Sequence, residues 1–123
     1  MEGKKVIFSC ARLIERKGID NVIQALPRVV ENIPQVIYLI GGDGEYRNRL
    51  EGLVKENELN EYVRFLGNIN HYEELPYFYA LCDVFILPSR QLESFDIEGF
   101  GIVYLEANAF GKPVIGPNIG AQK

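Results

Sequence analysis

The chain has 123 residues, 47% of them hydrophobic and 24% charged, a composition that fits a globular protein and excludes disordered and fibrous classes. Its 13 basic and 17 acidic residues give a net charge of −4, so the chain offers no general attraction to nucleic acid, and any attraction for phosphate must be local. No apolar run approaches the roughly 20 residues that span a bilayer, and the N-terminus lacks the regions of a signal peptide, so we expect one cytoplasmic domain.

The first predicted unit is a strand followed by a helix. Residues 5–9 form a short apolar run, which is typical of a buried strand. The apolar residues that follow at helical spacing are Ile19, Val22, Ile23, Leu26, Val29 and Val30. Pro27 removes one backbone hydrogen bond, but the apolar stripe continues on both sides of it, so we expect a kink rather than the end of the helix.

The loop between this strand and this helix is basic, with Arg12, Arg16 and Lys17. A solvated basic loop is one interpretation of such a cluster. The loop also follows the carboxyl end of a predicted parallel strand, where open α/β sheets bind their ligands. Its position therefore favours a binding role.

The second unit repeats this order. Residues 34–40 predict a strand, residues 41–44 a turn, and the helix that follows is marked by Tyr46, Leu50, Leu53 and Val54. Glycines 42 and 44 invite a dinucleotide-binding interpretation, but the third glycine of that pattern is missing and the turn follows the second strand. We expect instead a tight turn with a positive φ and a close approach to a neighbouring loop or a ligand.

A third strand is predicted at residues 62–66 and a helix at residues 72–82. The inward residues of this helix are expected to be Leu75, Phe78, Tyr79 and Cys82. Asn70 is the predicted N-cap, with Glu73 as its capping-box partner.

No metal site is predicted, because the loops contain neither an Asp-x-Asp pair nor a His/Cys cluster. Cys10 and Cys82 lack the spacing of metal ligands and are expected to be buried thiols. Nothing near His71, the only histidine, suggests that it acts as a catalytic base.

The last part of the chain predicts a strand at residues 83–89, a loop that turns into a helix at residues 98–106, and a fifth strand at residues 113–116. The start of a helix offers unpaired N–H groups and the positive end of a dipole, and both attract phosphate. Glu98 and Glu106 would repel a bare phosphate, so we expect them to hold hydroxyl groups. A sugar nucleotide carries phosphates and hydroxyls together.

Strands that alternate with helices predict an α/β fold, a Rossmann-like three-layer sandwich with a parallel sheet of about five strands. The loops of interest would then share one edge of the sheet.

Residues 98–107, followed by residues 111–116, resemble the donor-binding half of the group 1 glycosyltransferases, retaining enzymes of the two-domain GT-B architecture. The other segments that match in the expected order are residues 6–18, 39–44, 63–67, 79–83 and 87–89. The resemblance implies that residues 1–123 are a nucleotide-sugar-binding C-terminal domain, incomplete at its C-terminal end and without the acceptor domain. Such a fragment is expected to bind nucleotide weakly and to transfer no sugar by itself.

The resemblance also implies roles for particular residues. Arg12 and Lys17 would neutralise the diphosphate of the donor, and Glu98 would hold hydroxyls of the transferred sugar, so these three are the candidate catalytic residues. The candidate substrate-binding residues are Phe100, Gly101, Ile102, Val103, Glu106, Asn68 and Ile69. Among them, the amides of residues 101–103 would bind phosphate, Glu106 the ribose, and the loop that contains Asn68 and Ile69 the base.

The implied reaction needs no metal and no cofactor. Its donor would be a UDP- or GDP-sugar carrying mannose or glucose, and its acceptor a saccharide or a lipid, with the full enzyme cytoplasmic or peripheral to the membrane. Two alternatives stay open, a nucleotide-binding module without transferase activity and a GT-B nucleotide-sugar epimerase. The general-base histidines usual in that epimerase class have no counterpart here. For Glu106 the simpler interpretation is a solvated helix residue, but its apolar neighbours favour a buried carboxylate that needs a partner.

Overall fold

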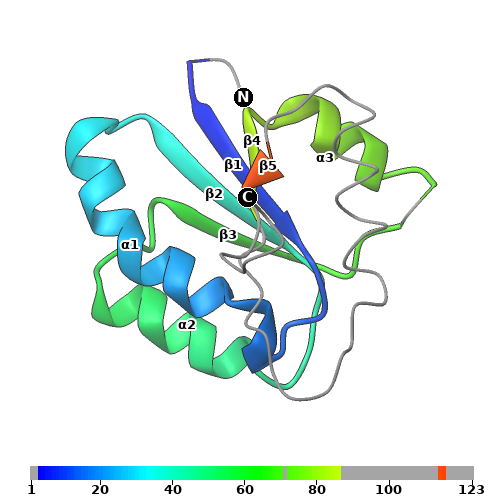
Figure 1. Ribbon diagram of the computed structural model, residues 1–123, viewed down its shortest axis with the longest axis horizontal. Helices are drawn as coiled ribbons and strands as arrows, with labels where there is room; N and C mark the ends of the chain where they lie inside the picture. The colour runs from blue at the N-terminus through cyan, green and yellow to red at the C-terminus, as the bar shows by residue number, and fades with distance from the viewer. Residues whose placement is uncertain (1–2, 71, 87–113, 116–123) are drawn as a thin grey trace, which may run out of the picture.

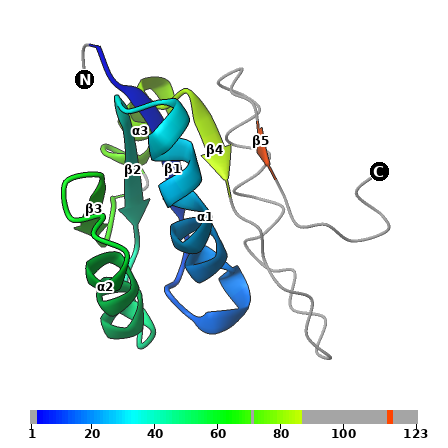
Figure 2. The same ribbon diagram turned by 90° about the vertical axis from the view of Figure 1, so that its left-hand side faces the viewer.

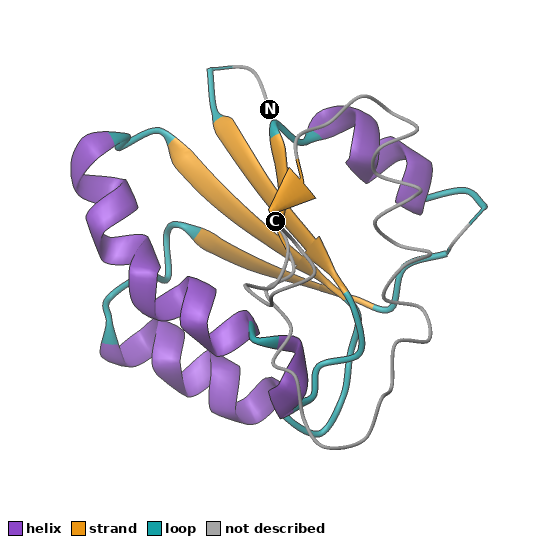
Figure 3. Ribbon diagram, viewed as in Figure 1, coloured by secondary structure: helices purple, strands orange, loops and turns teal. Residues whose placement is uncertain are grey.

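The computed structural model describes residues 3–70, 72–86 and 114–115. Its strands are β1 (Lys5–Cys10), β2 (Val36–Gly41), β3 (Val63–Gly67), β4 (Val84–Ile86) and β5 (Val114–Ile115). Its helices are the 3-10 turn η1 (Glu15–Lys17), α1 (Ile19–Asn32), α2 (Arg47–Glu56) and α3 (Leu75–Leu81). All the strand pairs are parallel and the order in the sheet is β3-β2-β1-β4-β5 (Figure 3), which confirms the predicted α/β fold.

The helices cover the two faces of this sheet. From β1 the chain moves outward through β2 to β3, and it then returns to the other side of β1 to form β4. Because parallel crossovers are right-handed, this reversal places α1 and α2 on one face and α3 on the opposite face. Figure 1 shows α1 and α2 side by side with the sheet between them and α3, and Figure 2 shows α1 and α2 in front of the sheet with α3 behind it. The change of direction between β1 and β4 marks the switch point of the sheet, where ligands of open α/β folds bind.

The core forms where the predicted apolar patterns meet. Every residue of β2 is buried, which explains why its sequence is a continuous apolar run rather than an alternating one. On the α3 face, the ring of Phe8 lies between 5.6 and 5.8 Å from the rings of Phe78, Tyr79 and Phe85. On α1 the buried residues are Ile19, Val22, Ile23 and Leu26. The helix continues through Pro27, as the unbroken apolar stripe predicted.

The third helix is shorter than predicted. It begins at Leu75 rather than at residue 72, because Pro76 has no N–H to donate to the carbonyl of Tyr72, as a helix starting at residue 72 would require. The cap also differs. Asn70 is not the N-cap of α3, because Glu74 occupies that position; its Oδ1 instead caps the turn before the helix, accepting from the N–H groups of Tyr72 at 2.8 Å and Glu73 at 2.9 Å. The reciprocal bond is accepted by Glu74 Oε1, which lies 2.8 Å from the N–H of Asn70, so the prediction of Glu73 as the partner was wrong.

Candidate functional site

Three loops leave the carboxyl ends of β1, β2 and β3, and backbone hydrogen bonds join the first two loops to each other. These strand-end loops are residues 11–14, 42–46 and 68–70. The backbone hydrogen bonds at this edge run from Ala11 N to Gly41 O (3.2 Å), Leu13 N to Asp43 O (3.0 Å), Tyr46 N to Leu13 O (2.9 Å) and Gly42 N to Gly67 O (2.7 Å). Main-chain bonds of this kind hold the first two loops together and tie the second to the end of β3, so the edge has a fixed shape.

Glycines make this close approach possible. Gly42 has a φ of 109°, and a Cβ atom placed on it would lie 1.9 Å from the carbonyl oxygen of Ala11. A Cβ atom on Gly44 would lie 2.5 Å from the carbonyl oxygen of Leu13. The prediction of a tight turn with a positive φ and a close backbone approach is confirmed, and the neighbour approached is the loop after β1.

The structure places the two candidate cations on the connection from β1 to α1. Arg12 lies between two residues whose N–H groups are bonded to the neighbouring loop, Ala11 and Leu13, while its own side chain is exposed. Leu13 is fully buried and anchors the loop. Lys17 ends η1 and is only 8% exposed. Arg12 is thus presented to solvent from a fixed backbone, and Lys17 lies against the fold beside the start of α1.

The loop after β3 holds the two described residues expected to bind the base. Asn68 is exposed and Ile69 is half-buried. A Cβ atom on Gly41 would lie 2.1 Å from Ile69 Cδ1 and 3.5 Å from Cys10 Sγ, so the side chain of Ile69 packs over the ends of β1 and β2. That packing holds the loop in place through the side chain of Ile69. A ligand at this loop would therefore contact the backbone or Asn68.

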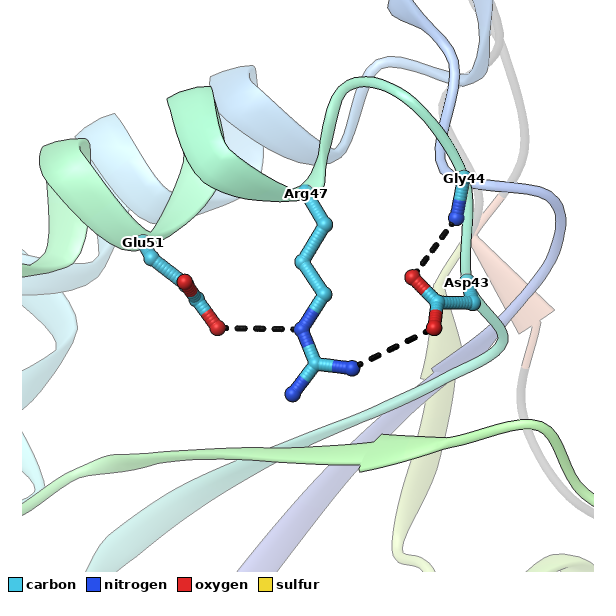
Figure 4. Close-up of polar contacts among 4 residues, drawn as sticks. All are labelled: Asp43, Gly44, Arg47 and Glu51. Carbon is cyan, nitrogen blue, oxygen red and sulfur yellow. Dashed lines mark hydrogen bonds and ion pairs between the residues drawn. The ribbon is translucent and has the colours of Figure 1, made fainter.

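A charged network that the sequence analysis missed fastens the loop after β2 to α2 (Figure 4). The guanidinium of Arg47 lies 2.9 Å from Glu51 through Nε and 3.5 Å from Asp43 through Nη1. Asp43 Oδ1 also accepts the N–H of Gly44 at 2.8 Å. The hydrogen bond to Glu51, followed by the charge of Asp43, raises the pKa of Arg47 above its ordinary value. The i,i+4 spacing of these residues was the available signal.

This network has an electrostatic consequence for the edge. The loop after β2 carries two carboxylates, Asp43 and Glu45, which oppose the binding of phosphate there. Asp43 forms an ion pair with Arg47. The cation of Arg47 offsets the charge of Asp43, and its guanidinium carbon also lies 5.5 Å from the centre of the Phe65 ring, in a cation–π contact with β3. Of the two carboxylates of the loop after β2, Asp43 is therefore the one whose charge Arg47 offsets.

Several candidates lie outside the described residues. They are Glu98, Phe100, Gly101, Ile102, Val103 and Glu106; His71, for which no catalytic role is predicted, is also outside the described residues. Their predicted roles stay predictions.

Within residues 3–70, 72–86 and 114–115, no group of three or more His, Cys, Asp or Glu side chains could hold a metal ion. Cys10 and Cys82 are free thiols and buried, as predicted. Over the same described part of the chain, no helix has both the length and the apolar character needed to cross a membrane.

The sequence matches the family model described as glycosyl transferases group 1 over residues 1–123. The chain belongs to the group 1 glycosyltransferases. This chain is thus a family member with a parallel sheet, a glycine-rich turn after β2 and a basic connection after β1.

Similar sequences within this family include enzymes named for mannosyl transfer. The chain is 39% identical over 118 residues to a GDP-mannose-dependent alpha-(1-6)-phosphatidylinositol monomannoside mannosyltransferase of Mycolicibacterium smegmatis, covering 95% of this chain and 31% of that protein. It is 40% identical over 111 residues to the O-antigen biosynthesis glycosyltransferase WclY of Escherichia coli, covering 90% of this chain and 28% of that protein. The chain therefore spans less than a third of the length of these group 1 glycosyltransferases.

Solved structures of other glycosyltransferases share the fold. Anabaena HepE in complex with UDP-glucose superposes with a TM-score of 0.79 at 30% identity, over 98% of this chain and 31% of HepE. The C-terminal domain of the group 1 protein LpcC from Francisella tularensis gives a TM-score of 0.78 at 27% identity, over 93% of this chain and 58% of that domain. The architecture found here is thus that of the C-terminal domain in a relative.

Proposed function

We propose that this chain is the donor-binding part of a hexosyltransferase and that a nucleoside diphosphate sugar binds at the strand-end loops. The observation that carries the proposal is the fixed carboxyl edge of the sheet, with Arg12 exposed on a backbone held from both sides. A rigid edge needs little reordering when an anion binds, so its charge acts at low entropic cost.

The chemistry assigned to this edge is the stabilisation of the leaving group. In glycosyl transfer the bond between the anomeric carbon and the terminal phosphate oxygen breaks, and the nucleoside diphosphate leaves with the bonding electron pair. The acceptor hydroxyl forms the new bond and loses its proton. Arg12 and Lys17 supply positive charge where the negative charge of the diphosphate grows, which allows transfer without a metal ion.

The remaining roles belong to the same proposal. Glu98 would hold sugar hydroxyls, Glu106 the ribose, and the amides of residues 101–103 the phosphates. The loop after β3, with Asn68 and Ile69, would hold the base. The chain matches only 31% of the mannosyltransferase from Mycolicibacterium smegmatis, so these residues are assigned donor binding alone, and acceptor binding is assigned to other parts of a full-length enzyme.

For the donor we propose GDP-mannose. The mycobacterial and corynebacterial relatives that are 37–40% identical to this chain are named as GDP-mannose-dependent mannosyltransferases. HepE, solved with UDP-glucose, is less similar at 30% identity. A UDP-sugar is the second candidate, and the relative affinities of GDP and UDP distinguish the two.

Calorimetric titration of the purified chain with GDP and with UDP tests the proposal. Arg12→Ala should weaken binding of the preferred diphosphate by about 1.5–3 kcal/mol, the scale of a hydrogen bond to a charged group, which corresponds to roughly 10- to 150-fold in Kd. Lys17→Met should weaken it on the same scale, and the methionine keeps much of the packing of the nearly buried lysine stem.

Lys4→Ala is the matched control, because Lys4 is exposed and precedes β1, at the opposite edge of the sheet. It removes one positive charge and should leave the affinity within about twofold, since exposed charges more than about 10 Å apart are largely screened at 0.1 M salt. If the wild-type chain, Arg12→Ala and Lys17→Met bind the diphosphate with equal affinity, neither Arg12 nor Lys17 belongs to the site.

A further inference from the structure

A buried chain of hydrogen bonds crosses the sheet just below the strand-end loops. The hydroxyl of Tyr38, on β2, lies 2.6 Å from Ser9 Oγ, on β1. Ser9 Oγ in turn donates to the carbonyl oxygen of Ile86, the last residue of β4, at 2.5 Å. The hydroxyl of Ser9 has a single hydrogen, and this hydrogen is given to Ile86, so Tyr38 must be the donor in the first bond. Tyr38 therefore donates a hydrogen bond to Ser9, and Ser9 donates one to Ile86.

Packing alone does not explain this pair. Tyr38 and Ser9 are both fully buried, and Tyr38 stands in a strand whose other residues are Val36, Ile37, Leu39, Ile40 and Gly41. A buried hydroxyl costs free energy unless it is hydrogen-bonded, whereas phenylalanine and alanine at these two positions would fill the space with no such requirement. What the two hydroxyls add to the fold is the hydrogen bond from Ser9 to the carbonyl of Ile86.

That bond lies at the end of the described pairing of β1 with β4. Among the described residues, this pairing consists of Ile7 with Val84 and Phe8 with Phe85. The pairing of β1 with β2 continues further, through Ser9 with Ile40 and Cys10 with Gly41. Ser9 is therefore paired with Ile40 of β2 in the sheet and bonded to Ile86 of β4 through its side chain.

The boundary between β1 and β4 is the switch point of the sheet, which is the position of the ligand crevice in open α/β folds. On one side of the switch point lies β1, which continues through Ala11 into the loop that carries Arg12. On the other side lies β4. The separation of β1 from β4 is therefore part of the geometry of this crevice.

We propose that Ser9 and Tyr38 are positioning residues for the nucleotide site, which fix the separation of β1 and β4 at the floor of the crevice. Ser9 holds the end of β4, and Tyr38 holds Ser9 in the rotamer that does so. This inference rests on the proposed function, because the crevice is taken to be the donor site. Neither residue touches the ligand.

The experiment compares Ser9→Ala, Tyr38→Phe and the double variant Ser9→Ala/Tyr38→Phe for thermal stability and for GDP affinity, well below each melting temperature. Ser9→Ala leaves the Tyr38 hydroxyl and the Ile86 carbonyl without this partner, so both stability and affinity should fall, the affinity about tenfold. The double variant removes both hydroxyls and should regain much of the stability without regaining the affinity. Ile23→Val, which removes a buried methyl group from α1, should lower stability and leave the affinity unchanged.

Amide hydrogen exchange provides the second readout. In Ser9→Ala the amides of β4 should exchange at least tenfold faster than in the wild-type chain, relative to the amides of β3, whereas Ile23→Val should show no such preference for β4. Wild-type affinity for GDP in the double variant, or exchange that rises equally in β3 and β4, would overturn the positioning role. A wild-type chain that binds neither GDP nor UDP would instead overturn the proposed function, and the exchange measurement would still decide whether Ser9 holds β4.

Discussion

The packing of the glycine-rich turn onto the loop after β1 predicts a large loss of stability for Gly42→Ala. The φ of 109° places an alanine there in a strained region, which costs about 1–3 kcal/mol. The added Cβ atom would lie 1.9 Å from Ala11 O, against an ordinary contact of at least 3.4 Å, so the two loops must separate by about 1.5 Å. That movement disrupts the bonds from Ala11 N to Gly41 O and from Gly42 N to Gly67 O, each worth about 0.5–1.5 kcal/mol net. The total is about 2–6 kcal/mol.

Three other glycines serve as matched controls, because they separate the backbone strain from the steric contact. Gly67 has a φ of 74° but nothing within 4 Å of an added Cβ, so alanine there should cost only about 1–2 kcal/mol. At Gly41 the closest atom, at 2.1 Å, is the end of the Ile69 side chain, which can rotate at a cost of about 1–3 kcal/mol. Gly52, inside α2, has neither obstacle, and alanine should stabilise the chain by about 0.5–1 kcal/mol.

Urea unfolding of the four alanine variants, with the slopes compared to confirm two-state behaviour, measures these free energies. Each kcal/mol should also move the melting temperature of a domain of this size by about 4 °C. The expected order of stability is Gly52→Ala, wild type, Gly67→Ala, Gly41→Ala and Gly42→Ala. A Gly42→Ala variant as stable as Gly67→Ala would show that the two loops are not in contact as described.

Three further predictions follow from the described residues. Binding of the diphosphate should survive EDTA, and a loss of affinity that magnesium or manganese restores would refute the role of the cations Arg12 and Lys17. Burial raises the pKa of Tyr38 above its ordinary value of 10.0, so this phenol ionises at lower pH in the unfolded chain than in the folded one. The free energy of unfolding should therefore fall as pH rises above about 10, by up to 1.4 kcal/mol per pH unit. The stability of Tyr38→Phe should depend less on pH, and identical pH curves for the two proteins would contradict the burial of this phenol. Asn70→Ala should cost about 1 kcal/mol in urea unfolding and Glu73→Ala close to nothing, because the cap uses the side chain of Asn70 and only the backbone N–H of Glu73; equal losses would argue against this cap.

The fold could be predicted largely from the sequence, because strong local patterns specify its elements. The apolar run at residues 5–9 and the helical stripe after Gly18 correspond to β1 (Lys5–Cys10) and α1 (Ile19–Asn32). The start of α3 was missed, although the missing N–H of Pro76 was visible in the sequence. Both results show that local chemistry decides where these elements begin.

The candidate site was less accessible to sequence reasoning, because its contacts join residues from different strands. The glycines at 42 and 44 indicated a close approach, but only the fold identifies the loop after β1 as the neighbour. The chain from Tyr38 through Ser9 depends on the register of β2 against β1, which no local pattern reveals. The network around Arg47, in contrast, could have been found from its i,i+4 spacing.

An amide-shift titration of the labelled chain with GDP, UDP and their sugar conjugates shows directly whether a nucleoside diphosphate binds at the carboxyl edge of the sheet. We expect saturable shifts in the strand-end loops, residues 11–14, 42–46 and 68–70, with GDP acting at lower concentration than UDP. The amide shifts of residues at the opposite edge, such as Lys5 and Val36 with their hydrogen bonds to Gln35 and Ile33, should stay unchanged. Shifts confined to that opposite edge, or no saturable shifts with any of these nucleotides, would contradict binding at the carboxyl edge.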